Sequence, residues 1–294
     1  MSSRSTAGPV AFAVGMLLLS MISYQCGASL AKHLFPQVGA LGATAYRLGF
    51  SALILLLWRR PWRRWGGGRD WRVVCGYGLA MGAMNMVFYL SLRTIPLGIA
   101  VALEFTGPLA LALSGSRRLI DFVWIALVVG GLVLLLPLRG QVQTLDPIGV
   151  IYALAAGAGW ALYIVLGKKA GAAWGGDAVT LGTSVGALLA IPFGVATAGS
   201  ALLSLDLLPY ALGVALLSSA LPYSLEMLAM TRLPARTFST LLSLEPAVAA
   251  LAGVALLGEQ LSLLQWLAIA TIIVAATGIA LSVRRPVLTE PLAN

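Results

Sequence analysis

Gly39-Ala-Leu-Gly-Ala-Thr-Ala-Tyr-Arg-Leu-Gly-Phe-Ser-Ala-Leu-Ile-Leu-Leu-Leu-Trp58 is the stretch that decides the fold class. An apolar run of about 20 residues is long enough to cross the hydrocarbon core of a bilayer as a helix. The run holds one charged residue, Arg47, and the next six residues, Arg59-Arg-Pro-Trp-Arg-Arg64, hold four arginines. Arginines gathered directly after an apolar run are typical of the cytoplasmic end of a membrane helix. This stretch therefore predicts a spanning helix and its orientation.

The same pattern repeats along the chain. Hydrophobic residues make up 60% and charged residues 10% of the 294 positions, whereas soluble domains carry about 25% charged residues. This composition excludes a soluble globular fold and predicts an all-α integral membrane protein. Ten apolar runs are long enough to span: Val10–Ala31, Gly39–Trp58, Val73–Leu92, Leu97–Gly115, Phe122–Leu138, Ile148–Gly167, Ala178–Ala198, Pro209–Met230, Thr237–Leu257 and Leu263–Val283.

The basic residues follow the alternation that these runs impose. With the N-terminus inside, 15 of the 19 lysines and arginines fall in cytoplasmic segments, three fall on the opposite side, and Arg47 stays within a run. This asymmetry obeys the positive-inside rule and favours an even number of spans with both termini cytoplasmic. The net charge of +9 thus orients the protein in the lipid bilayer, and we expect no nucleic-acid partner.

The sequence also indicates an internal duplication of a five-helix unit. Leu92-Arg-Thr-Ile-Pro96 is echoed by Met230-Thr-Arg-Leu-Pro234, and each proline is followed twelve residues later by another, Pro108 and Pro246. Five helices per half is an odd number, so the second half enters the membrane inverted, as in many secondary transporters. Chance similarity between apolar helices is the alternative. The predicted units are a first repeat at 1–138, an inverted repeat at 147–283 and a cytoplasmic tail at 284–294.

Four ionisable side chains lie inside the runs: Arg47, Glu104, Glu226 and Glu245. Such residues are costly in a membrane and are functional candidates. A guanidinium binds a carboxylate bidentately and a carboxylate binds an ammonium group, so together they suit a zwitterion such as an amino acid. Burial favours the neutral form of a carboxyl group, which makes Glu104 and Glu245 candidates for proton coupling. The alternative is a structural ion pair between Arg47 and one of these acids.

Further polar and aromatic residues inside the runs are candidates for lining a pathway, although each is also explained by an interhelical hydrogen bond or an interfacial ring. These candidates are Tyr24, Gln25, Asn85, Tyr89, Trp160 and Tyr163, and the last four are predicted to bind substrate. Proline removes a backbone hydrogen bond inside a helix. Three prolines lie close to the buried acids and are predicted hinges or helix breaks, with a simple packing kink as the alternative: Pro108, Pro222 and Pro246.

The residues needed for enzyme chemistry are missing from the sequence. It contains one histidine, His33, and two cysteines, so we expect no metal centre and no histidine-dependent catalytic triad. A Gly-x-x-x-x-Gly-Lys-Ser/Thr phosphate loop is also absent. We therefore predict no enzyme and no cofactor, and any uphill transport has to use an ion or solute gradient.

Several stretches carry a family resemblance. The ten-helix layout and the turn Leu257-Gly258-Glu259 resemble the EamA type of the drug/metabolite transporter superfamily. More distinctive stretches are similar to the threonine/homoserine exporter branch of that family: Pro96-Leu-Gly-Ile-Ala-Val-Ala-Leu-Glu-Phe-Thr-Gly-Pro108, Asp121-Phe-Val-Trp124, Leu221-Pro-Tyr-Ser-Leu-Glu-Met227, Thr231-Arg-Leu-Pro-Ala-Arg-Thr-Phe238 and Glu245-Pro-Ala247.

The resemblance implies an exporter of small neutral amino acids in the bacterial inner membrane, driven by proton antiport through alternating access. Its partners would be the amino acid, protons and the bilayer, with a homodimer as one open arrangement. Two other functions stay open. An exporter of drug-like or other metabolite cations would use the acids and aromatic rings without Arg47, and a non-transporting membrane scaffold would leave the buried charges as structural pairs.

Overall fold

The computed structural model describes residues 7–64, 70–95, 97–114, 119–135, 146–233, 238, 241–258 and 262–282. Every regular element within these ranges is a helix. The long α-helices are α1 (Ala7–Lys32), α2 (Phe35–Arg59), α3 (Trp71–Ser91), α7 (Pro147–Trp174) and α8 (Asp177–Ala198). A further long segment joins α9 (Leu208–Ala215), the π-helical turn η4 (Leu216–Ala220) and α10 (Leu221–Arg232).

The remaining α-helices are shorter: α4 (Leu97–Glu104), α5 (Thr106–Ser114), α6 (Leu119–Leu135), α12 (Glu245–Leu257) and α13 (Leu263–Ser282). Short 3₁₀ turns occur at Pro61–Arg64, Gly199–Leu203, Leu205–Leu207 and Leu242–Leu244, named η1, η2, η3 and η5.

Six helical segments in the described residues are long and apolar enough to cross a membrane. Four shorter apolar helices accompany them, at Ile99–Leu111, Phe122–Gly131, Glu245–Leu256 and Trp266–Ala275. Each of the ten expected runs overlaps one of these segments, in the expected order. The all-helical membrane architecture is thus confirmed, while length and hydropathy alone qualify six of the ten runs as spans.

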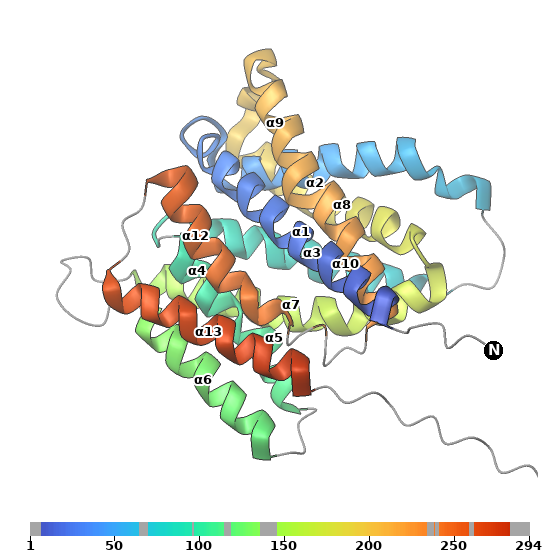
Figure 1. The fold of residues 1–294 in the computed structure, drawn as a ribbon. Helices are drawn as coiled ribbons and strands as arrows, with labels where there is room; N and C mark the ends of the chain where they lie inside the picture. Colours follow the sequence, from blue (N-terminus) through green and yellow to red (C-terminus); the bar gives the residue numbers. More distant parts are fainter. Residues whose placement is uncertain are drawn as a thin grey trace, which may run out of the picture.

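The helices pack side by side along the molecule. The most extensive contacts join α2 with α8 and α3 with α7, and α6 packs along α13 at one edge (Figure 1). Glycines allow the closest approach. A Cβ atom added to Gly82 of α3 would lie 2.9 Å from the Cα of Gly186 in α8, so the two backbones touch without side chains between them. The small-residue spacing Gly78-x-x-x-Gly82 therefore serves helix packing.

In four places within the described residues, regular α-helical geometry is interrupted at or next to a proline or glycine. In α2 the backbone leaves helical geometry at Gly39, whose φ is 68°. The fourth run is divided at Phe105, so that α4 ends at Glu104 and Pro108 lies in the first turn of α5. Pro222 and Pro246 each lie in the first turn of a helix, after η4 and after η5 respectively.

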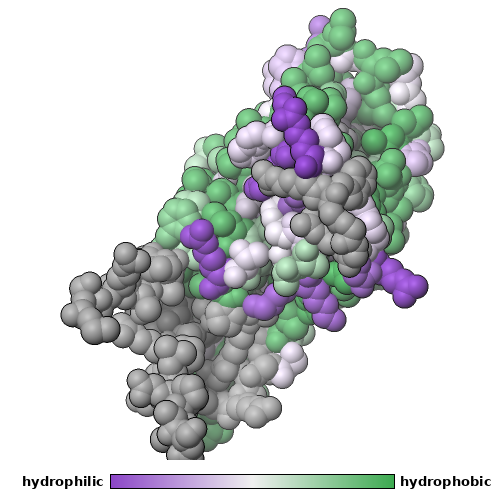
Figure 2. Space-filling model, turned by 90° about the vertical axis from the view of Figure 1, so that its right-hand side faces the viewer, coloured by the Kyte–Doolittle hydropathy of each residue, from purple (hydrophilic) through white to green (hydrophobic). Residues whose placement is uncertain are grey.

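Polar and apolar surfaces are separated. The N-terminal end of α1, the Arg59 end of α2 and the Arg232 end of α10 lie toward the same side of the molecule (Figure 1). Figure 2 looks onto that side, and strongly hydrophilic side chains gather on it while hydrophobic ones cover the flanks. Large apolar side chains of the long helices, such as Ile151 in α7 and Leu188 in α8, are more than half exposed. Such a surface is suited to contact with lipid.

Candidate functional site

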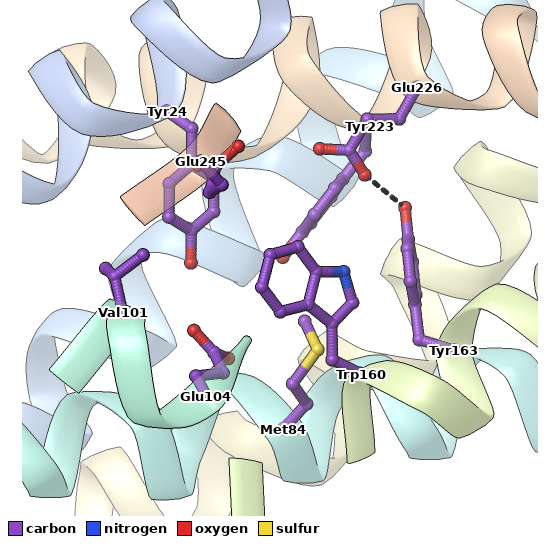
Figure 3. A pocket seen from close by; sticks show the side chains of 9 residues that line it. All are labelled: Tyr24, Met84, Val101, Glu104, Trp160, Tyr163, Tyr223, Glu226 and Glu245. Atoms are coloured by element: carbon purple, nitrogen blue, oxygen red, sulfur yellow. Dashed lines mark hydrogen bonds between the residues drawn. The ribbon is translucent and has the colours of Figure 1, made fainter. Parts of the chain in front are cut away.

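A small cavity lies where six helices converge, and side chains from each of them line it (Figure 3). The cavity has a volume of about 20 Å³, enough for only one or two water molecules. Three carboxyl groups and four aromatic rings dominate the wall. The lining residues are Tyr24 of α1, Met84 of α3, Val101 and Glu104 of α4, Trp160 and Tyr163 of α7, Tyr223 and Glu226 of α10, and Glu245 of α12.

The three carboxyl groups differ in their hydrogen bonds. Glu226 accepts two, from the Ser20 hydroxyl at 3.1 Å and from the Tyr163 hydroxyl at 2.9 Å. Glu245 accepts one from the side-chain amide of Gln25 at 2.7 Å. Glu104 accepts none from any side chain or backbone group in the described part of the chain, although it is only 4% exposed. Its carboxyl group points into the cavity (Figure 3).

The ends of the helices add to this difference. Glu245 is the first residue of α12, where the partial positive charge of the helix N-terminus favours a carboxylate. Glu104 is the last residue of α4, at the negative end of its helix. Glu104 therefore has neither a hydrogen-bond donor nor a favourable helix end. Of the three acids, it is the one most available to a cation or a proton that enters the cavity.

The position of Glu104 follows from one proline and one glycine. Pro108 has no N–H group to donate to the Glu104 carbonyl four residues earlier. That carbonyl instead faces Gly157 of α7, where an added Cβ atom would lie only 2.5 Å from the carbonyl oxygen. A glycine at 157 thus lets the break between α4 and α5 lie directly on the backbone of α7.

Arg47 lies behind the cavity, fully buried, and is held by hydroxyl and carbonyl oxygens. Its Nε donates to the Ser219 hydroxyl at 2.7 Å. Its Nη2 donates to the Ser218 carbonyl at 2.6 Å and to the Tyr223 hydroxyl at 3.0 Å. Its Nη1 donates to the Tyr24 hydroxyl at 3.4 Å. None of the described acids lies within 4.0 Å of the guanidinium, so the structural ion pair considered for Arg47 is not formed among these residues.

The π-helical turn η4 supplies the backbone oxygen that Arg47 uses. Pro222 lacks the N–H that would otherwise reach the Ser218 carbonyl in an α-helix. Carbonyls in and next to η4 also accept from α1 and α2, because Ser23 donates to Leu217 and Ser51 donates to Ala215, both at 2.7 Å. Hydrogen bonds from two other helices therefore satisfy the irregular turn, as backbone groups inside a membrane require.

The eight predicted substrate contacts fall into two layers. Five line the cavity: Glu104, Trp160, Tyr163, Glu226 and Glu245. Three lie behind it, namely Arg47, Asn85 and Tyr89. Asn85 donates to the Tyr223 hydroxyl at 2.7 Å, and the Tyr89 ring centroid lies 5.1 Å from the Arg47 guanidinium carbon.

Three lining residues were not among the candidates: Met84, Val101 and Tyr223. Tyr24, a candidate for lining a pathway although not a predicted substrate contact, lines the cavity as well. Tyr223 precedes Glu226 by three residues, which puts both on one helix face, and that spacing is the signal that would have found it. Met84 and Val101 carry no signal that separates them from other apolar residues of their helices. No group of three side chains suited to hold a metal ion comes together in the described residues.

Comparisons with known proteins place the chain among membrane transporters. A family model described as the EamA-like transporter family matches residues 147–281. Two similar proteins, both named threonine/homoserine exporter RhtA, come from Salmonella typhimurium (strain LT2) and Escherichia coli (strain K12). Each is 52% identical over 277 residues, which is 94% of both chains. A crystal structure with 18% identity shares the fold, with a TM-score of 0.69 over 94% of this chain and 98% of that one.

Proposed function

The chain belongs to the EamA-like transporter family, and from this membership we propose that it exports small neutral amino acids of the threonine and homoserine type across the bacterial inner membrane. Relatives that match nearly its whole length are named as exporters of those two amino acids. Membership in a transporter family argues against both an enzyme and a non-transporting scaffold.

One observation in the site carries the proposal. Glu104, whose carboxyl group accepts no hydrogen bond from the described residues, faces a central cavity, and the buried guanidinium of Arg47, which has no acidic partner among those residues, lies directly behind the cavity wall. A free amino acid carries one ammonium and one carboxylate group, so it complements both poles. The contracted cavity has to widen before such a molecule fits, as transport by alternating access requires.

Helix packing supports two inverted five-helix repeats, at 1–138 and 147–283. If α1, α2, α3, α4–α5 and α6 are matched in order with α7, α8, α9–α10, α12 and α13, the contacts fall into equivalent pairs. The contact of α3 with α7 matches that of α1 with α10, and the contact of α3 with α8 matches that of α2 with α9. The contacts of α2 with α8, and of α6 with α13, join equivalent helices. The family model also matches one repeat by itself.

The cytoplasmic location of both termini rests on the basic residues. Exposed arginines and lysines lie at the ends of α2, α7 and α10, and the ends of α2 and α10 share a side of the molecule with the N-terminal end of α1 (Figure 1). By the positive-inside rule that side faces the cytoplasm.

We assign proton coupling to Glu104 rather than Glu245, because Glu245 already accepts a hydrogen bond from Gln25 and lies at a helix N-terminus. In liposomes, the wild-type protein should exchange labelled threonine for unlabelled threonine, and a pH gradient should drive net transport. Glu104→Gln should lose the pH-driven component. The matched control is Asp206→Asn, the same chemical change at an exposed turn outside the cavity. Full pH-driven transport by Glu104→Gln at normal protein levels would refute the assignment.

A second candidate function has one observation in its favour. The cavity wall carries three acids together with Tyr24, Trp160 and Tyr163, while Arg47 stays behind it. Such a wall also suits a lipophilic cation, through carboxylate pairing and cation–π contacts. Competition decides between the two functions. An amino-acid exporter exchanges labelled threonine and is inhibited by unlabelled threonine, whereas a cation exporter exchanges labelled tetraphenylphosphonium and is not inhibited by threonine.

A further inference from the structure

Tyr24 separates the buried guanidinium from the cavity. The Arg47 guanidinium carbon lies 4.7 Å from the centroid of the Tyr24 ring, and Nη1 donates to the Tyr24 hydroxyl. The same side chain lines the cavity. In Figure 3 its hydroxyl points into the cavity, toward the carboxyl group of Glu104. Tyr24 therefore stands between the cationic and the anionic group of the site.

Tyr24 is also the most weakly held contact of Arg47. Its hydrogen bond of 3.4 Å is the longest of the four, since the other three measure 2.6 to 3.0 Å, and bonds weaken at such lengths. The Tyr24 hydroxyl has no other hydrogen-bond partner among the described residues. Tyr223, the other tyrosine between Arg47 and the cavity, is fixed by the Asn85 amide at 2.7 Å. Of these two rings, Tyr24 is the one that is free to turn.

Arg47 has unused capacity on the Tyr24 side. A guanidinium has five N–H donors, and the Nε and both Nη2 positions are occupied by short hydrogen bonds. Nη1 has two donors and, within the described part of the chain, makes only the long bond to Tyr24. A buried guanidinium without an anionic partner costs free energy. An anion that reaches Nη1 would therefore bind strongly, provided that Tyr24 moves aside.

We propose that Tyr24 is the specificity gate for the α-carboxylate of the substrate. When the cavity widens, the Tyr24 side chain turns away from Arg47, and the substrate carboxylate takes its place on Nη1 while Glu104 holds the ammonium group. This inference rests on the proposed amino-acid transport. It adds that Arg47 recognises the substrate carboxylate and that the Tyr24 side chain controls access to Arg47. Arg47 and Glu104 then select molecules that carry both charges.

The test compares threonine with threoninol, which has the same side chain and ammonium group but a hydroxymethyl group in place of the carboxylate. Each is used as a competitor of labelled threonine exchange in liposomes. Wild type should prefer threonine by roughly tenfold or more, since hydrogen bonds to charged groups are the strong ones. Tyr24→Phe removes the hydroxyl that competes for Nη1, so threonine should compete roughly two- to fivefold better. Competition by threoninol should not change.

The control variant is Tyr210→Phe, which removes a tyrosine hydroxyl away from the site. Tyr210 lies in α9, is 51% exposed and does not line the cavity. Its ratio of threonine to threoninol competition should equal that of wild type. If threonine exchange persists, either of two results overturns the gate. One is equal competition by threonine and threoninol in wild type, and the other is a ratio in Tyr24→Phe that equals the wild-type ratio. No exchange of any amino acid by wild type would instead overturn the proposed function itself.

Discussion

Replacing Gly157 by alanine tests how the broken helix α4–α5 packs against α7. The added Cβ atom would lie 2.5 Å from the Glu104 carbonyl oxygen and 3.3 Å from the backbone nitrogen of Gly107. Ordinary contact begins at 3.4 Å, so α4 and α7 have to separate by about 0.9 Å, the difference between 3.4 and 2.5 Å. Because both partners are backbone, no side-chain rotation relieves the clash.

The expected effect is a loss of stability. Overpacking a well-packed interior costs about 1–3 kcal/mol, and a backbone clash belongs in the upper part of that range. Alanine in a helix gains up to about 1 kcal/mol over glycine, which leaves Gly157→Ala less stable by about 1–2 kcal/mol. The matched control is Gly76→Ala in α3, whose added Cβ would lie 3.5 Å from a leucine methyl group, in ordinary contact. That variant should be as stable as wild type or slightly more so.

Thermal unfolding of the purified protein in detergent measures the difference. The midpoint of Gly157→Ala should fall below that of Gly76→Ala by roughly 5 °C, given about 2–4 °C per kcal/mol for chains of this size. Threonine exchange should also decrease, because the displaced backbone belongs to Glu104. Equal midpoints for the two variants would show that α4 and α7 do not touch in the way described.

Three further changes probe individual hydrogen bonds. Ser51→Ala removes the bond to the Ala215 carbonyl and should lower the unfolding free energy by about 1 kcal/mol, measured by denaturant titration; no change would mean that the carbonyl finds another donor. Tyr163→Phe leaves Glu226 with Ser20 as its described donor, so we expect a loss of about 1–3 kcal/mol and reduced exchange, and a fully stable, active variant would contradict this. Hydrogen bonds from the Thr94 side chain and from the backbone of Ile148 and Gly149 lower the pKa of Asp146. The ionised Asp146 therefore stabilises the folded protein above the pKa of about 4 that an aspartate has in the unfolded chain. This stabilisation is lost as the pH falls through the lower pKa of the folded protein. Asp146→Asn should therefore unfold at a lower temperature than wild type at pH 7, and the gap should close in acid; a gap that does not change with pH would rule this out.

The sequence was a good guide to the helices and to the acids. Hydrocarbon requires long apolar runs, so the ten segments stand out, and Glu104, Glu226 and Glu245 stand out within them because a charge in an apolar run is rare. These three acids do meet at one cavity. The prolines likewise lie at helix breaks, since a missing N–H acts locally.

The sequence could not tell which side of the cavity wall a residue occupies. Arg47 is as conspicuous as the acids, yet it lies one layer farther out, because that placement depends on how α2 packs against η4 and α1. Tyr24 and Tyr223 are ordinary aromatic residues of membrane helices, and only the fold brings them between Arg47 and the cavity. The π-helical turn at Leu216–Ala220 has no sequence signature beyond the proline that follows it.

Six consecutive residues of α1 hold a position that restricts how this protein can move. Ser20, Ser23, Tyr24 and Gln25 bind, respectively, the acid of α10, the irregular turn before it, the arginine of α2 and the acid of α12. A rotation of α1 about its own axis would break all four links together. Movement of α1 relative to η4, α10 or α12 would therefore cost several hydrogen bonds, whereas the break at Phe105 between α4 and α5 carries none of these four links. We expect the polar network to move as a unit and the break between α4 and α5 to act as its hinge.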